Sequence, residues 1–225
     1  MKRSTRIAGI VFLTLAFADV LSIAIGGNNL HFFIKPFLMP SLAVTALLQL
    51  LPEHNCKLTW LMLTGLCFHT LGDILLMFDS KGFVYFAAGL GAFMVGHFFY
   101  LAVLLSGMGG FKSWKEVLCL VGPLALAPVL VGLFGVEWPF SAVVTIYAFT
   151  LMCVAASGAL WSIRKKEFAC RIFWGGLIFI ISDSLIAVSA FAGIDFPFRG
   201  TLVMLTYLLA EWLLVSGMIA KISSK

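Results

Sequence analysis

Long apolar runs alternate with short polar breaks along the whole chain. Each run is close to the roughly 20 residues that an α-helix needs to cross the hydrocarbon core of a bilayer. Turn-forming and charged residues fill the breaks, as in GGNN at 26–29, PEHN at 52–55, DSKG at 79–82 and RKKE at 164–167. The pattern predicts one all-α transmembrane domain over residues 1–225, with eight helices near 7–25, 30–51, 58–78, 82–106, 116–134, 139–162, 170–192 and 199–220.

Composition supports a polytopic membrane protein. Of the 225 residues, 62% are hydrophobic and 11% are charged, whereas soluble domains are about half apolar and a quarter charged. The first apolar run follows the basic start MKRSTR but contains Asp19, so we interpret it as a retained span and not as a cleaved signal peptide. The five cysteines lie apart, without the spacing of a zinc site or a disulfide framework.

The basic residues predict the orientation. With eight spans both termini share one side, and twelve of the fifteen Lys and Arg residues then fall on that side, against Lys81 and Arg199 on the other and Lys35 inside the second span. Cytoplasmic loops are enriched in Lys and Arg, so we expect both termini in the cytoplasm, and the short loops favour a bacterial inner membrane. The net charge of +5 is explained by these loops and needs no nucleic acid partner.

Two aspartates interrupt apolar helices where charge is costly. Asp73 lies in FHTLGDILLMF and Asp183 in IFIISDSLIA. Insertion scales put a carboxylate at a helix centre at about 2.5–3.5 kcal/mol, and such residues usually face the bundle interior and serve a function. Two acids with different environments are what acid/base chemistry requires. We therefore predict that Asp73 and Asp183 are catalytic.

Further polar residues lie within the predicted spans. Lys35 either biases the charge of the aspartates or forms an ion pair that only fixes helix packing. Asp19 lies near the end of its span, where we expect water to solvate it. His69 shares a helix face with Asp73, and His97 with Tyr100. The other candidates for a supporting or substrate-binding role are Tyr147, Tyr207 and Glu211.

A weak internal repeat is visible at an offset of 110 residues. Gly65 precedes Asp73 by eight residues, as Gly175 precedes Asp183, and His97 corresponds to Tyr207. Parallel repeats are a known plan in membrane proteins, although apolar runs also align by chance.

The order of these motifs resembles the YhhN family of lysoplasmalogenase-like membrane proteins. The motifs are KP (Lys35, Pro36), GD (Gly72, Asp73), GHxxY (His97, Tyr100), a tyrosine in the sixth span (Tyr147), GG…F…SD (Gly175, Gly176, Phe179, Ser182, Asp183) and Yxx-A-acid (Tyr207, Ala210, Glu211). They cover most of the chain. The family pattern usually ends in YxxAQ, and here Glu211 takes the place of the amide.

The resemblance implies hydrolysis of the vinyl ether bond of lysoplasmalogens, a class of lysophospholipid, to a fatty aldehyde and glycerophosphoethanolamine or glycerophosphocholine. The residues suit this reaction, because a vinyl ether is hydrolysed through an oxocarbenium ion, which glycosidases manage with two carboxyl groups. Lys35 would bias the charges of Asp73 and Asp183, and His97, Tyr100 and Tyr207 would hold the headgroup or water. No metal or other cofactor is required.

Two other classes of protein use buried acids. An intramembrane aspartic protease is disfavoured because TLGD lacks a glycine two residues before GD and no PAL follows Asp183. A proton-coupled transporter or lipid-binding membrane protein stays open, since buried Asp, Lys and His also form proton relays.

Overall fold

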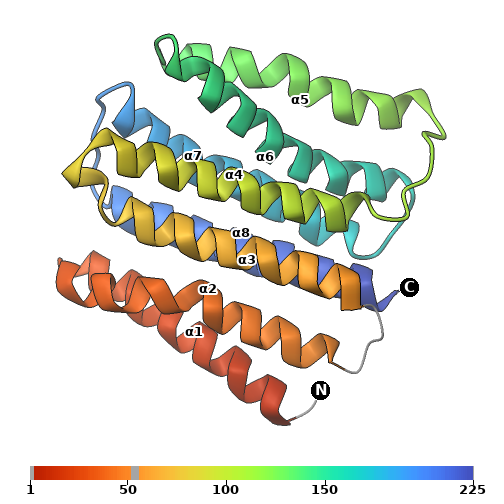
Figure 1. The fold of residues 1–225 in the computed structure, drawn as a ribbon, viewed down its shortest axis with the longest axis horizontal. Helices are drawn as coiled ribbons and strands as arrows, with labels where there is room; N and C mark the ends of the chain where they lie inside the picture. Colours follow the sequence, from red (N-terminus) through yellow and green to blue (C-terminus); the bar gives the residue numbers. More distant parts are fainter. Residues whose placement is uncertain (1–2, 52–55, 225) are drawn as a thin grey trace. The chain divides into compact units, whose positions relative to one another are not determined.

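The computed structural model describes residues 3–51 and 56–224, apart from the side chains of Asn28 and Cys56. These residues form helices and no strands (Figure 1). The elements are α1 (Arg3–Ala24), α2 (Asn28–Leu50), α3 (Cys56–Leu76), the short 3-10 helix η1 (Asp79–Lys81), α4 (Phe83–Leu105), α5 (Trp114–Leu133), α6 (Phe140–Ile163), α7 (Ala169–Ala190) and α8 (Arg199–Ser223). The predicted turn at 52–55, Lys2 and Lys225 lie outside the described residues.

The eight α-helices confirm the predicted class and are each long and apolar enough to cross a membrane. Every helix begins and ends within four residues of the predicted span. The largest difference is at the start of α1, where the helix includes Arg3 and Ser4. A helical hydrogen-bond ladder can continue through polar residues after the apolar run stops, so hydropathy underestimates its length.

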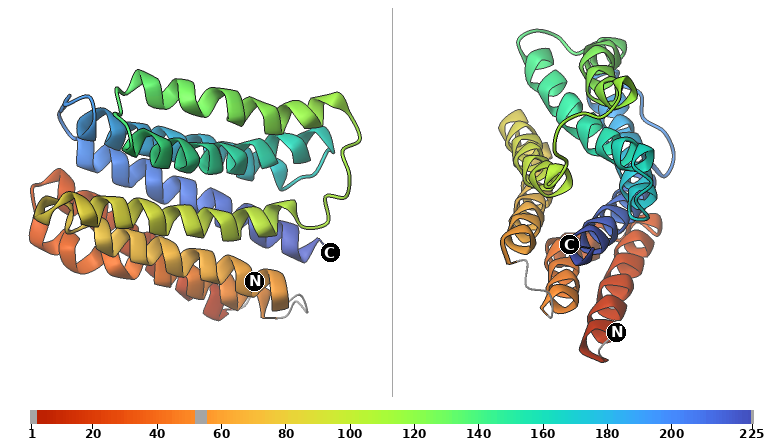
Figure 2. Two further views of the ribbon diagram at one scale, coloured as in Figure 1. Left: turned by 45° about the horizontal axis from the view of Figure 1, so that its top comes forward. Right: turned by 90° about the vertical axis from the view of Figure 1, so that its right-hand side faces the viewer.

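The helices form two compact units. The first comprises Met1–Val103 with Ile219–Lys225, and the second comprises Leu104–Met218. Within each unit, consecutive helices run in opposite directions (Figure 2). The assignment of all 225 residues to one domain stays a prediction.

Glycines allow close packing of α3 on α4 in the first unit, where α1 also packs on α2 and α2 on α3. A Cβ atom at Gly65 would lie 2.7 Å from the Tyr100 ring, and one at Gly72 would lie 2.7 Å from the Phe93 ring. Small residues let the backbones of membrane helices approach closely. They bring the α4 aromatic residues against the face of α3 that carries His69 and Asp73.

The second unit uses glycines in the same way. Here α5 packs on α6 and α6 on α7. A Cβ atom at Gly176 of α7 would lie 2.5 Å from Cα of Ala155 on α6, and one at Gly175 would lie 3.0 Å from the Leu214 side chain on α8. Two adjacent glycines thus pack α7 against a helix on each side.

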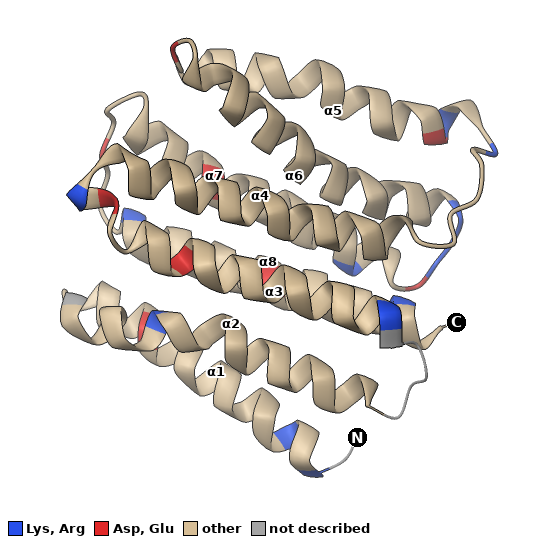
Figure 3. Ribbon diagram, viewed as in Figure 1, with Lys and Arg blue, Asp and Glu red and all other residues tan. Residues whose placement is uncertain are grey.

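Basic residues gather at helix ends. Figure 3 shows that most Lys and Arg positions lie in loops and terminal turns. In the first unit, the start of α1 and the end of α8 lie at the same end, as an even number of spans requires (Figure 1). The cytoplasmic location of that end stays a prediction.

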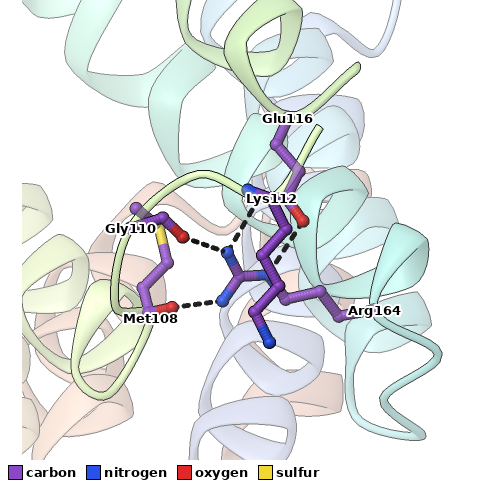
Figure 4. Close-up of polar contacts among 5 residues, drawn as sticks. All are labelled: Met108, Gly110, Lys112, Glu116 and Arg164. Carbon is purple, nitrogen blue, oxygen red and sulfur yellow. Dashed lines mark hydrogen bonds and ion pairs between the residues drawn. The ribbon is translucent and has the colours of Figure 1, made fainter. Parts of the chain in front are cut away.

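Arg164, at the end of α6, holds the segment that leads into α5 (Figure 4). Its guanidinium donates hydrogen bonds to the carbonyl oxygens of Met108 and Gly110 and to both carboxylate oxygens of Glu116, at 3.0 Å and 2.8 Å. One turn earlier, Nε1 of Trp161 donates to the carbonyl of Leu104 at 2.7 Å. The hydrogen bond from Arg164 to Glu116 raises the pKa of the guanidinium further above its usual range. The side chains of Trp161 and Arg164 therefore fix the segment 104–112 through hydrogen bonds to its backbone carbonyls.

Candidate active site

Asp73 lies in a buried polar setting on α3, three residues before the helix ends. Its Oδ1 is 3.8 Å from Nζ of Lys35 on α2, and both side chains are largely shielded. Lys35 directly precedes Pro36 in the N-terminal half of α2. Lys35 thus lies close to Asp73, and its predicted effect on the charge of that carboxyl group stays a prediction. An ammonium at this distance balances the charge of a buried carboxylate.

His69, His97 and Tyr100 form a buried aromatic cluster beside Asp73. The ring centroids of His69 and His97 are 4.7 Å apart, and the His69 and Tyr100 rings meet edge-on at the same distance. His69 lies one turn before Asp73, so both project from the same face of α3. The first unit therefore brings together five of the predicted residues, Lys35, His69, Asp73, His97 and Tyr100.

The expectation that water solvates Asp19 is wrong. Its side chain is fully buried, and Oδ1 forms a 2.8 Å hydrogen bond with Nδ1 of His31 on α2. Sequence reasoning missed His31, because it lies only two residues after the polar break GGNN and resembles an exposed residue at a helix start. The available signal is its spacing, since His31 lies four residues before Lys35 and therefore on the same face of α2.

The second predicted acid, Asp183, is half-buried and has a different partner. The phenolic hydroxyl of Tyr147 on α6 donates a short hydrogen bond to Oδ2 of Asp183 on α7. Glu211 on α8 is fully buried and lies within electrostatic range of the same tyrosine. Three predicted residues from three helices thus form one polar group in the second unit.

Tyr207 lies one turn before Glu211 on α8. Its ring meets Phe179 of α7 edge-on, with the centroids 5.5 Å apart. Ser182 of α7 donates a hydrogen bond at 3.0 Å to the backbone carbonyl of Val203 on α8. These contacts pack α7 against α8 at Phe179 and Ser182, which precede Asp183 by four residues and by one residue. The supporting or substrate-binding role of Tyr207 stays a prediction.

Asp73 and Asp183 belong to different compact units, and their joint action stays a prediction. Each unit supplies a carboxyl group held by a neighbouring helix: Asp73 is buried beside an ammonium, and Asp183 is half-buried beside a phenol. Such groups can donate, accept or relay a proton inside an apolar environment.

Comparison with known proteins identifies the relationship. The YhhN family model matches residues 30–218. The membrane protein YhhN of Escherichia coli O6:H1 is 31% identical over 128 residues, which are 56% of this chain and 59% of the relative. The lysoplasmalogenase TMEM86A of Bos taurus is 30% identical over 154 residues, 67% of this chain and 61% of the relative. The alignments thus span about three fifths of each relative, and no solved structure matches.

Proposed function

Because the chain belongs to the YhhN family, we propose that this multi-pass integral membrane protein is a lysoplasmalogenase-like hydrolase. It would cleave the vinyl ether bond of a lysoplasmalogen and release a fatty aldehyde and glycerophosphoethanolamine or glycerophosphocholine. The similarity to a relative named lysoplasmalogenase supports the reaction class.

The observation that carries the proposal is the presence of two aspartates inside membrane-length helices in chemically different settings, Asp73 buried and Asp183 half-buried. Asp73 lies beside the ammonium of Lys35, which suits a carboxylate that stays ionised. Asp183 lies beside the neutral phenol of Tyr147, which suits a carboxyl group that exchanges a proton. We assign Asp183 the acid role and Asp73 the carboxylate role.

In the first step, the proton of the Asp183 carboxyl group adds to the β-carbon of the vinyl ether. The C=C electron pair forms the new C–H bond and leaves an oxocarbenium ion, whose positive charge the Asp73 carboxylate stabilises. Water then adds to the cationic carbon as Asp73 accepts a proton, which gives a hemiacetal. As the C–O bond of the hemiacetal breaks, Asp73 gives its proton to the glycerol oxygen and the hemiacetal hydroxyl gives its proton to Asp183. The aldehyde and the glycerol hydroxyl are released, and both acids are back in their starting protonation states. Two carboxyl groups handle an oxocarbenium ion in glycosidases by the same division of roles.

The test is aldehyde release from lysoplasmenylethanolamine by the purified protein in detergent. We expect Asp73→Asn and Asp183→Asn each to abolish release, while Asp79→Asn, at an exposed aspartate just beyond α3, retains it. Folding is checked by size-exclusion chromatography and the thermal midpoint. Near-normal aldehyde release by Asp73→Asn or by Asp183→Asn would overturn the assignment.

A proton-coupled transporter is the second candidate function. The contact between the buried imidazoles of His69 and His97 favours it, because adjacent histidines can form a proton relay. A transporter needs a proton gradient, so aldehyde release in detergent would exclude transport as the explanation of the buried acids. Proton-dependent solute uptake into vesicles without any hydrolysis would support it.

A further inference from the structure

We propose that His31 and Lys35 of α2 form a binding site for the phosphodiester group of a lysophospholipid, with His31 positioned by the buried carboxylate of Asp19. The choice of a lysophospholipid rests on the proposed function. The phosphodiester anion is shared by all headgroups of this class, so the site recognises the class and not one headgroup.

The first step concerns the Asp19–His31 pair. An ionised carboxylate only accepts hydrogen bonds, so Nδ1 of His31 carries the proton in the 2.8 Å contact with Oδ1. This contact fixes the ring and leaves Nε2 as the atom that can meet a ligand. Among the described residues, Oδ2 of Asp19 has no hydrogen-bond partner although it is buried. A buried carboxylate with an unsatisfied oxygen is costly, and a positively charged partner offsets that cost.

The second step compares the exposure of two side chains on α2 with that of the two acids on the neighbouring helices. The side chain of His31 is 23% exposed and that of Lys35 is 12% exposed, whereas the side chains of Asp73 and Asp19 are 3% and 0% exposed. The two potential cations are thus the accessible members of this group, and the two acids lie behind them. An anion that approaches from outside would meet His31 and Lys35 first.

The third step concerns distance along the helix. His31 and Lys35 are four residues apart, which is a rise of about 6 Å on one face of α2. A lysoplasmalogen carries its phosphodiester and its vinyl ether oxygen at the two ends of a three-carbon glycerol. A phosphodiester held between His31 and Lys35 therefore places the ether oxygen beyond Lys35, on the side of Asp73.

The start of α2 adds to the attraction. His31 lies in the first turn, where helix N–H groups without intrahelical partners favour negative charge. The imidazolium and the ammonium supply the charge-assisted hydrogen bonds that hold a phosphate oxygen.

The experiment measures binding with ligands that cannot be hydrolysed. The probes are a 1-O-alkyl lysophosphatidylcholine, which has a saturated ether, and the 1-O-alkylglycerol of the same chain length without the phosphate. Dissociation constants are obtained from tryptophan fluorescence of the full chain in detergent. We expect His31→Gln to weaken binding of the phospholipid about tenfold, the loss of one charge-assisted contact, and to leave alkylglycerol binding unchanged.

Three further variants test whether a loss of binding comes from lost recognition of the phosphate or from a disturbed fold. His31→Arg keeps a cation at the site and should retain most of the preference for the phospholipid, and Asp19→Asn should reduce it. Lys81→Gln removes an exposed cation in η1, just beyond α3, and should leave both constants unchanged. An equal loss of binding for both lipids in His31→Gln, or an equal effect of Lys81→Gln, would overturn the proposal.

Inorganic phosphate distinguishes a lipid headgroup from a free anion. We expect it to compete only weakly with the lysophospholipid, and displacement at low concentration would overturn the lipid assignment. The binding result is independent of catalysis. Binding that is selective for the phospholipid, without aldehyde release, would refute the proposed hydrolysis and support the phosphodiester site. Aldehyde release with unselective binding would support the hydrolysis and refute the phosphodiester site.

Discussion

The two proposed catalytic aspartates differ in the partner that the preceding helix supplies. Lys35 of α2 faces Asp73 of α3 with a charge, and Tyr147 of α6 faces Asp183 of α7 with a neutral hydroxyl. In an apolar environment an unpaired carboxylate is costly, so each partner is needed for stability as well as for chemistry. Replacing Lys35 or Tyr147 therefore distinguishes the roles of the two acids more clearly than replacing the acids themselves.

The first prediction concerns Tyr147→Phe, which removes the hydroxyl and keeps the ring. Asp183 is protonated in the proposed starting state, and a hydrogen bond between neutral groups contributes about 0.5–1.5 kcal/mol, so we expect aldehyde release to fall roughly 2- to 10-fold. Tyr85→Phe, at an exposed tyrosine of α4, is the matched control and should leave the rate unchanged. A rate for Tyr147→Phe equal to that of the control would show that the hydroxyl plays no part in the reaction.

The second prediction concerns the charge balance between Lys35 and Asp73. Lys35→Met leaves the Asp73 carboxylate without its ammonium, so we expect a lower thermal midpoint in detergent and loss of activity. Combining Lys35→Met with Asp73→Asn removes both charges and should recover most of the midpoint without recovering activity. A double variant less stable than Lys35→Met alone would contradict the pairing.

At the scale of helices, equivalent positions of the two units make similar contacts. His69 and His97 meet in the first unit, and 110 residues further on Phe179 and Tyr207 meet in the second. At the same offset, the close approach of Gly72 to Phe93 corresponds to the hydrogen bond from Ser182 to Val203. Residues that correspond in the internal repeat thus also make corresponding contacts in the structure. The internal repeat itself stays a prediction.

The third prediction concerns the packing of α6 on α7. A methyl group at Gly176 would press on the backbone of Ala155, and overpacking costs about 1–3 kcal/mol. We expect Gly176→Ala to lower the thermal midpoint. Gly91→Ala in α4 has no atom within 4 Å of the new Cβ and removes a flexible residue from a helix, so its midpoint should stay the same or rise. Equal midpoints for the two variants would refute tight contact at Gly176.

At the scale of the whole molecule, the fourth prediction concerns orientation. The Lys and Arg distribution places both termini in the cytoplasm. We therefore expect a fluorescent protein fused to the C-terminus to fluoresce in bacteria, alkaline phosphatase fused after Lys81 to be active, and the same enzyme fused after Lys166 to be inactive. Activity after Lys166 would reverse the orientation.

The helices could be predicted from the sequence because a bilayer fixes their length and apolar composition. The burial of Asp73 could be predicted because charge inside an apolar helix is costly, whereas the chemistry of Asp73 and Asp183 stays a prediction. The partners were harder to predict, since His31 reaches Asp19 across a turn and Arg164 reaches Met108 and Gly110 from a distant loop. Such contacts depend on helix rotation and loop path, which hydropathy does not encode. The basic run RKKE predicts orientation but gives no sign that Arg164 binds backbone carbonyls.

The hydrogen bonds of Trp161 and Arg164 have a consequence for the order of events during synthesis. The carbonyls of Leu104, Met108 and Gly110 are made about fifty residues before the side chains that bind them. When α4 has left the ribosome, the segment after it therefore still lacks these partners. The first four helices are therefore synthesised before the segment can be fixed, in the same order as the N-terminal-first folding of nascent chains.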